Sequence, residues 1–179
     1  MKISQRDAGF NGGIKVGFTA YDSTSRTLNT RLTDAKNILE KELDSHGYTL
    51  LRRIDRRTNP ILIKGANPDG GIWLDPNGIT IAAFEAKKQG IRGNAHERWF
   101  KNHRLLSHIN PDIRYVTFLS GEGAMDDSGM AGDFKTVLLM EGKEPTFGTI
   151  HPKGCSFVAS KDGFSLSEVV EIMRKAVMQ

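Results

Sequence analysis

The chain has 179 residues, with 25 Lys and Arg against 21 Asp and Glu, and a single cysteine, Cys155. This length suits one domain over residues 1–179 with a core of its own, and a lone cysteine excludes an internal disulfide and suits a reducing, cytoplasmic compartment. We expect no membrane span and no secretory signal, and a net charge of +4 with a pI near 9.2 points weakly toward nucleic acid.

The first third of the chain predicts a loose segment followed by a helix and a strand. Residues 1–30 are rich in Gly, Ser and Thr, and we expect them to be loose or to depend on a partner for order. Apolar residues at helical spacing predict a helix over residues 32–45, which Gly47 would end. The basic cluster at residues 52–57 could contact DNA, although a solvated loop is the plainer interpretation, and residues 61–64 predict a strand.

Residues 68–87 predict a β-hairpin. An Asp-Pro-Asn-Gly turn, with Pro second and Gly last, joins two runs rich in Ile, Trp and Phe. Pairing outward from a four-residue turn sets Leu74 against Ile79, and it brings Asp69 beside Phe84 and Glu85 at the other end of the hairpin.

Asp69, Glu85 and Lys87 are the candidate catalytic residues. Side chains alternate along a strand, so Glu85 and Lys87 share one face. Two carboxylates and an ammonium at one place suit Mg²⁺ held against a phosphate, because Mg²⁺ prefers carboxylate and water oxygens and lowers the pKa of its bound water. The plainer alternative is turn chemistry and a solvated edge strand, but the combination in one hairpin favours catalysis. Asp75 lies in the turn, roughly 33 Å from Glu85 along an extended strand, and cannot share the ion.

The segment after the hairpin is basic and predicts a helix. Residues 86–104 hold six cations against one acid, Glu97. Asn94 followed by Glu97 is typical of a capping box, so we expect a helix from Ala95 to about His108. Its N-terminal amides could face DNA, although an ordinary surface helix fits these residues equally well. The expected inward residues are Ala95, Trp99, Leu106 and Ile109, and the expected outward cations are Arg98, Lys101 and Arg104.

The last third of the chain predicts three strands and a closing helix. Residues 114–119 and 136–140 are expected to be buried strands, separated by an acidic, Gly-rich loop over residues 121–132. Residues 155–159 predict a further strand, and residues 165–178 an amphipathic helix capped by Ser165 or Ser167. The predicted fold class is therefore α/β, with a mixed central β-sheet flanked by helices.

Three ordered motifs within residues 60–122 resemble those of EcoRI-type restriction endonucleases in the PD-(D/E)xK superfamily. The motifs are the Pro-Asp-Gly-Gly-Ile of residues 68–72, the Glu-Ala-Lys of residues 85–87 with Gln89-Gly90, and the Gly-Asn-Ala, Glu-Arg and Lys-Asn elements of residues 93–102. The resemblance implies a restriction-endonuclease-like core in a homodimer that cuts both strands of palindromic double-stranded DNA with Mg²⁺. It implies metal ligation by Asp69 and Glu85, catalysis by Lys87, base reading by Asn94, Ala95 and Arg98, contact with a thymine methyl by Gln89, and backbone contacts by Lys101 and Asn102.

The same resemblance implies a recognition site containing AATT and a cognate DNA methyltransferase as a partner of the system rather than a binding partner. The dimer interface would include Trp99 or Phe100, either of which could instead be a core residue. Only Ile91 and Arg92 stand where larger members carry an insertion that helps to read outer base pairs, so no outer pair is predicted. Two alternatives remain: a non-specific or structure-specific nuclease in repair, recombination or phage DNA processing, and a binding module or inactive relative.

Overall fold

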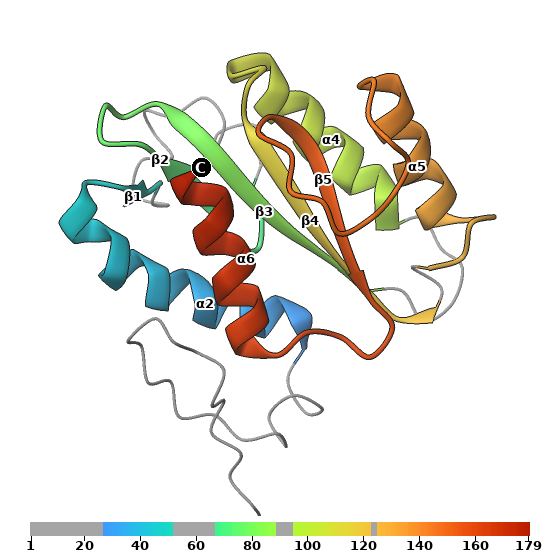
Figure 1. The fold of residues 1–179 in the computed structure, drawn as a ribbon, viewed down its shortest axis with the longest axis horizontal. Coiled ribbons are helices and arrows are strands. Elements are labelled where there is room, and N and C mark those ends of the chain that lie inside the picture. The colour runs from blue at the N-terminus through green and yellow to red at the C-terminus, as the bar shows by residue number, and fades with distance from the viewer. Residues whose placement is uncertain (1–26, 52–66, 89–94, 123–124) are drawn as a thin grey trace, which may run out of the picture.

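Five strands form one mixed sheet in the part of the chain that the structure describes (Figure 1). The structure is a computed structural model that describes residues 27–51, 67–88, 95–122 and 125–179. The sheet order is β1-β2-β3-β4-β5, in which the first two pairings are antiparallel and the last two are parallel. The strands are β1 (Thr49–Leu50), β2 (Ile72–Leu74), β3 (Thr80–Lys88), β4 (Arg114–Ser120) and β5 (Gly154–Ser160).

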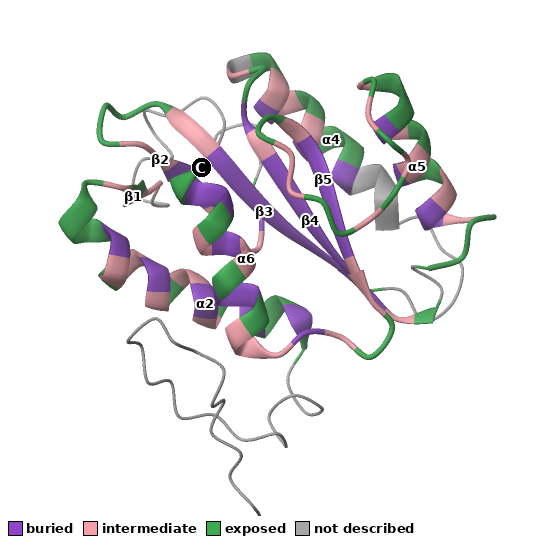
Figure 2. Cartoon of the chain, viewed as in Figure 1, coloured by how far each residue is buried: buried purple, intermediate pink, exposed green. Residues whose placement is uncertain are grey.

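Helices cover both faces of this sheet, so the predicted α/β architecture with a mixed sheet is confirmed. The helices are α2 (Leu28–Leu43), α4 (Ala95–Ile109), α5 (Met130–Met140) and α6 (Leu166–Met178), with the short 3₁₀ helix η1 (Asp44–His46) after α2. One core lies between the sheet and α2 with α6, and a second core lies between the sheet and α4 with α5. Figure 2 shows the buried residues along β3, β4 and β5 and on the helix sides that face them.

Helix α2 begins earlier than the sequence predicts. Thr27 is its N-cap, and the backbone N–H of Thr30 donates to the Thr27 hydroxyl at 3.2 Å. Leu28 is buried and extends the apolar stripe of the helix by one turn toward the N-terminus. Residues 27–30 are therefore ordered, in contrast to the expectation of a loose segment, because a Thr cap and a buried Leu stabilise the first turn. Residues 1–26 lie outside the described residues.

The hairpin forms as predicted, but its register is different. Gly78 donates to the Asp75 carbonyl at 2.9 Å and has φ +78°, so the loop has three residues and a glycine in the left-handed region. Leu74 consequently pairs with Thr80 instead of Ile79, and an irregularity between Trp73 and Leu74 moves the pairing by one more residue.

The predicted strand over residues 136–140 is wrong, because these residues form the last turn of α5. A short apolar run fits a buried strand and a helix equally well when it is considered alone. Met130 and Leu138 are buried, whereas Leu139 and Met140 are 59% and 83% exposed, as expected for a helix that buries one side. The loop expected over residues 121–132 is shorter for the same reason, because α5 begins at Met130.

Most other predicted elements are confirmed where the structure describes them. The buried strands over residues 114–119 and 155–159 lie within β4 and β5. Helix α4 begins at Ala95, and α6 is capped by Ser165 through a capping box with Glu168. The predicted strand at residues 61–64 and the basic cluster at residues 52–57 lie outside the described ranges. Within those ranges, no helix combines the length and the apolar character needed to cross a bilayer.

Candidate active site

Glu85 and Lys87 lie side by side on one face of β3, as their spacing predicts. Ala83 belongs to the core under α4 and α5, whereas Phe84 and Ala86 belong to the core under α2 and α6. Because side chains alternate along the strand, Glu85 and Lys87 face the α4 side. They are only 3% and 9% exposed, and the Lys87 ammonium donates to Oε1 of Glu85.

Asp69 precedes β2 and is carried to this site by the backbone of the hairpin. Gly70 donates to the Phe84 carbonyl at 2.9 Å, and the Ala86 N–H donates to Oδ2 of Asp69 at 3.1 Å. The sequence-based register set Asp69 beside Phe84 and Glu85, but with the observed register it lies opposite Ala86. Asp69 nonetheless comes close enough to Glu85 to raise the pKa of that carboxyl.

The two glycines after Asp69 are required because neighbouring segments of the chain come very close to them. A Cβ atom on Gly70 would lie 2.6 Å from the Cβ of Phe84, and a Cβ on Gly71 would lie 2.5 Å from a methyl of Leu50. Gly71 also has φ +82°, in the region that favours glycine. The Pro-Asp-Gly-Gly sequence is thus the local reason why Asp69 can sit against β3.

Asn29 is a site residue that the sequence analysis missed. It lies in the first turn of α2, and its side-chain amide donates to Oδ1 of Asp69 at 2.9 Å. The cap at Thr27 could have revealed the start of the helix, but no local signal connects Asn29 with a residue 40 positions away. Both oxygens of Asp69 therefore receive a hydrogen bond, one from a helix and one from a strand.

The Glu85 carboxyl is electrostatically unusual. Burial raises its pKa, and nearby Lys87 opposes this effect. Asp69 acts in both directions, because its charge raises the Glu85 pKa and its backbone N–H lowers it. Oε1 accepts from Lys87, whereas Oε2 is buried and has no hydrogen-bond partner among the residues that the structure describes. An unsatisfied buried carboxylate oxygen is costly, so it suggests a site for a cation or a donor that the chain itself does not supply.

Helix α4 is anchored next to Glu85 through β4. Thr117 is the β4 partner of Glu85 in the parallel pairing, and the Trp99 indole donates to the Thr117 hydroxyl at 2.6 Å. Trp99 is fully buried, and its ring lies against those of Tyr115 and Phe157. Of the two interpretations of Trp99, the core residue is therefore the one found.

The residues predicted to contact DNA are only partly described. Gln89 and Asn94 lie outside the described residues, and Ala95 and Arg98 belong to α4 with side chains that are not described. Lys101 is exposed and free to meet a phosphate. Asn102 is only 4% exposed, and this burial does not favour its predicted contact with the DNA backbone.

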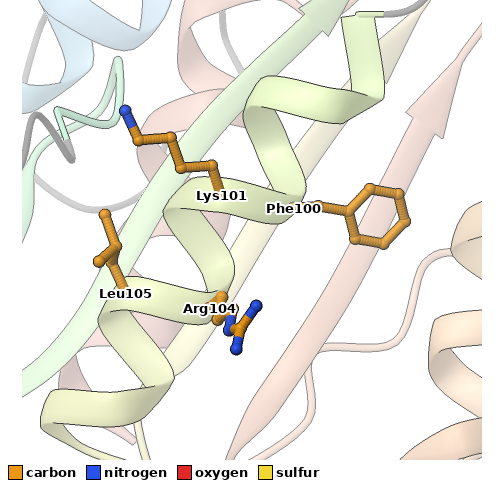
Figure 3. A pocket seen from close by; sticks show the side chains of 4 residues that line it. All are labelled: Phe100, Lys101, Arg104 and Leu105. Carbon is orange, nitrogen blue, oxygen red and sulfur yellow. The ribbon is translucent and has the colours of Figure 1, made fainter.

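The outer surface of α4 carries an open hollow of about 370 Å³. It is lined by Phe100, Lys101, Arg104 and Leu105, and Figure 3 shows Lys101 and Leu105 on one side of the helix and Phe100 on the other. Phe100 is 37% exposed, and both cations are exposed. This surface combines positive charge with apolar area, as surfaces that bind nucleic acid or protein do.

Comparisons of the chain with protein-family models, with curated proteins and with solved structures found no match. The geometry nevertheless brings the three predicted catalytic residues together: Asp69 and Glu85 interact electrostatically, and Lys87 pairs with Glu85. Asp75 is separate from them. Its carboxylate accepts from the backbone N–H groups of Asn77 at 2.9 Å and Ile79 at 2.8 Å, so it stabilises the turn.

Proposed function

We propose that the protein is a metal-dependent DNA endonuclease with a restriction-endonuclease-like core, cutting at a short palindrome. The observation that carries the proposal is the buried Glu85, which has one oxygen paired with Lys87 and the other without a partner in the described chain, beside Asp69. Two carboxylates and a lysine in this relation suit phosphodiester hydrolysis with a divalent ion.

The donor set fits Mg²⁺. Oε2 of Glu85 is a buried, hard oxygen donor without a hydrogen-bond partner among the described residues, and the Asp69 carboxylate has lone pairs beyond those used by Asn29 and Ala86. Mg²⁺ typically takes one or two carboxylates and completes its shell with water and substrate phosphate. When bound, the ion would lower the pKa of a water and offset charge on the phosphate in the transition state.

Lys87 has two tasks in this proposal. Its ammonium holds Glu85 in place before DNA binds, which limits the cost of a buried carboxylate. With DNA bound, it donates to an oxygen of the scissile phosphate or orients the attacking water. Because Lys87 is only 9% exposed, such an interaction would take place with little water present and would be stronger for that reason.

Glu85 and Lys87 lie near the carboxyl end of β3, where open α/β sheets usually bind their ligands. Lys101 and Arg104 on the exposed side of α4 suit the DNA backbone, and the N-terminal region of α4 would read bases through Asn94, Ala95 and Arg98. One such site cuts one strand, so we propose a homodimer whose two-fold axis matches that of the DNA site. A centre of AATT remains the proposed sequence, with a methyltransferase protecting host DNA.

Digestion of a sequenced plasmid with Mg²⁺, followed by run-off sequencing of the ends, tests the proposal. We expect discrete fragments with ends that map to sites containing AATT. A smear of DNA fragments of all lengths would instead support the non-specific nuclease alternative. Folded protein that binds DNA but cuts nothing with Mg²⁺ or Mn²⁺ would overturn the nuclease proposal and support an inactive relative.

A further inference from the structure

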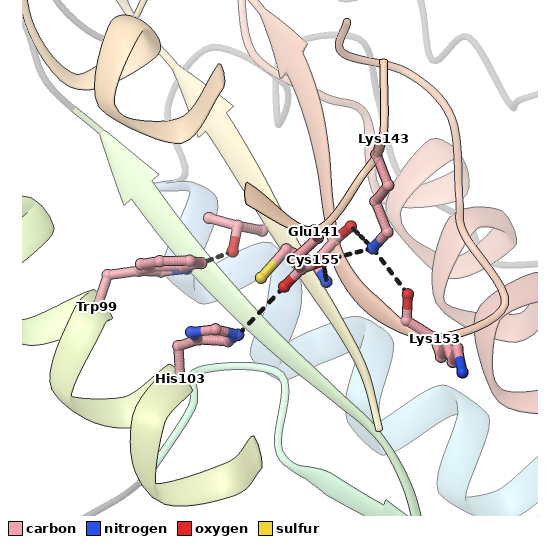
Figure 4. Close-up of polar contacts among 7 residues, drawn as sticks. Trp99, His103, Glu141, Lys143, Lys153 and Cys155 are labelled. Carbon is pink, nitrogen blue, oxygen red and sulfur yellow. Dashed lines mark hydrogen bonds and ion pairs between the residues drawn. The ribbon is translucent and has the colours of Figure 1, made fainter. Parts of the chain in front are cut away.

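A second group of polar side chains gathers where α4, the end of α5 and β5 meet (Figure 4). It consists of His103 on α4, Glu141 directly after α5, and Cys155 on β5. One potential ligand atom from each residue lies within 4.8 Å of the others. None of these side chains was predicted as a site residue from the sequence, and the proposed nuclease chemistry does not need them.

The three donors suit one metal ion of borderline softness. Zn²⁺ is bound in proteins by Cys sulfur, His nitrogen and carboxylate oxygen, with bonds of about 2.0–2.3 Å in tetrahedral geometry. Nε2 of His103 lies 3.6 Å from Oε1 of Glu141. Two ligands of one tetrahedral Zn²⁺ are about 3.4 Å apart, so this pair needs little movement to share an ion.

Glu141 is held in an orientation that turns Oε1 toward Nε2 of His103. Its other oxygen, Oε2, accepts from the Lys143 ammonium at 2.6 Å and from the Cys155 N–H at 2.9 Å. Lys143 also donates to the carbonyls of Lys153 and Cys155, both at 2.7 Å. Fixing a ligating carboxylate through its second oxygen is a common role for groups that surround metal ligands.

His103 is held by aromatic stacking. Its ring lies 5.0 Å from the Trp99 ring at an interplanar angle of 10°, and 5.8 Å from the Tyr115 ring at 12°. Both rings are fully buried, so the imidazole has a rigid support. The His103 and Glu141 side chains are still 22% and 24% exposed, which gives an ion and a water a route from solvent.

We propose that His103, Glu141 and Cys155 form a site for one Zn²⁺, with a water molecule as the fourth ligand. Binding forms a bond from the metal to Sγ of Cys155 while the thiol proton leaves to solvent. The neighbouring Lys143 ammonium opposes the incoming charge, and we therefore expect an affinity weaker than that of an all-thiolate site. The bound ion would join α4 to β5 and to the α5–β5 connection, and thereby stabilise the layer that supports Glu85.

Titration of the metal-free, untagged full chain with Co²⁺, a spectroscopic substitute for Zn²⁺, tests this site. A cobalt–thiolate bond gives a charge-transfer band in the near ultraviolet, and Cys155 is the only cysteine in the chain. We expect the band to saturate at one equivalent and to disappear when Zn²⁺ is added. Absence of the band in the folded protein with excess Co²⁺ would overturn the proposal.

Variants separate the proposed site from a metal held by the thiol alone. His103→Ala and Glu141→Gln should each weaken Co²⁺ binding about 10-fold or more, and an unchanged titration in both would also overturn the proposal. His103 and Glu141 are partly exposed, so these two variants avoid the folding risk of replacing the buried Cys155. Glu85→Gln is the control: it should abolish cleavage under the proposed function and leave the cobalt–thiolate band intact. Failure of one proposal is therefore distinguishable from failure of the other.

Discussion

The side-chain amide of Asn29 donates a 2.9 Å hydrogen bond to Oδ1 of Asp69, although 40 positions separate the two residues. The bond connects the first turn of α2 to the loop before β2. Since Ala86 donates to the other oxygen, the Asp69 carboxylate is oriented by a helix on one side and a strand on the other. Such orientation matters most if Asp69 ligates a metal, because ligand geometry then decides the rate.

Asn29→Ala should therefore weaken metal use without abolishing the fold. Loss of a group that orients a metal ligand typically costs 10–100-fold in metal affinity or activity. We expect the Mg²⁺ concentration for half-maximal cleavage to rise by about this factor, measured on plasmid DNA. Asn37→Ala, an exposed position two turns later in α2, is the matched control and should leave the Mg²⁺ dependence unchanged. A lower melting temperature with the same Mg²⁺ dependence would show that Asn29 is only structural.

Removal of any of the three proposed catalytic side chains should stop cleavage. Asp69→Ala and Glu85→Ala are expected to lose at least about 100-fold in rate, since several kcal/mol of transition-state stabilisation depend on the bound ion, and Lys87→Ala should lose most activity. Asp75→Ala should cut at nearly the normal rate, because its carboxylate bonds only to the turn. Circular dichroism would verify that each variant is folded. An inactive Asp75→Ala beside an active Asp69→Ala would refute the assignment.

Gly70→Ala should disturb the site through the backbone. The new methyl would lie 2.6 Å from the Cβ of Phe84, so the loop that carries Asp69 has to move. We expect a loss of about 1–3 kcal/mol in unfolding free energy, as for other overpacked positions, together with reduced cleavage. Gly78→Ala provides the comparison. It has φ +78° and open space around it, so it should cost about 1 kcal/mol of strain and spare activity. Urea denaturation and a cleavage assay measure both quantities.

Tyr115 should make the protein sensitive to alkali. Burial raises its pKa well above the ordinary 10.0, nearby Glu85 adds to this effect, and nearby Asn102 acts in the opposite direction. Below the unfolded pKa both states keep the proton, so nothing is lost. Above it the unfolded chain releases the proton while the folded chain retains it, and stability falls as pH rises. Tyr115→Phe should reduce this loss of stability between about pH 9 and 11. Thermal melting at several pH values measures it, and an unchanged pH profile would contradict the prediction.

The exposed cations of α4 should contribute to DNA affinity without sequence preference. Lys101→Ala and Arg104→Ala are each expected to weaken binding to all sequences and to reduce the slope of log affinity against log salt by about 1. Lys175→Ala is the control, because Lys175 is exposed on α6, which packs on the opposite face of the sheet. Asn94→Ala should instead erode the preference for adenine, by about 1–3 kcal/mol. Fluorescence anisotropy at several salt concentrations distinguishes these outcomes.

Local sequence was sufficient for the elements whose signals are local. The turn around Asp75, the start of α4 at Ala95 and the Ser165 cap of α6 were all predictable, because turn residues and caps act over a few neighbouring positions. The shared face of Glu85 and Lys87 also follows from the period of a strand. These signals were enough to nominate the residues that we propose to be catalytic.

Only the tertiary structure decided what depends on distant contacts. The register of the hairpin follows from a bulge and a three-residue loop, and the strand predicted at residues 136–140 is a helix because Leu138 packs on the sheet while Met140 faces solvent. The bond from Asn29 to Asp69 and the gathering of His103 with Cys155 join residues that are far apart in the chain. Such contacts depend on how layers pack, and packing is a property of the whole fold that no short window of sequence contains.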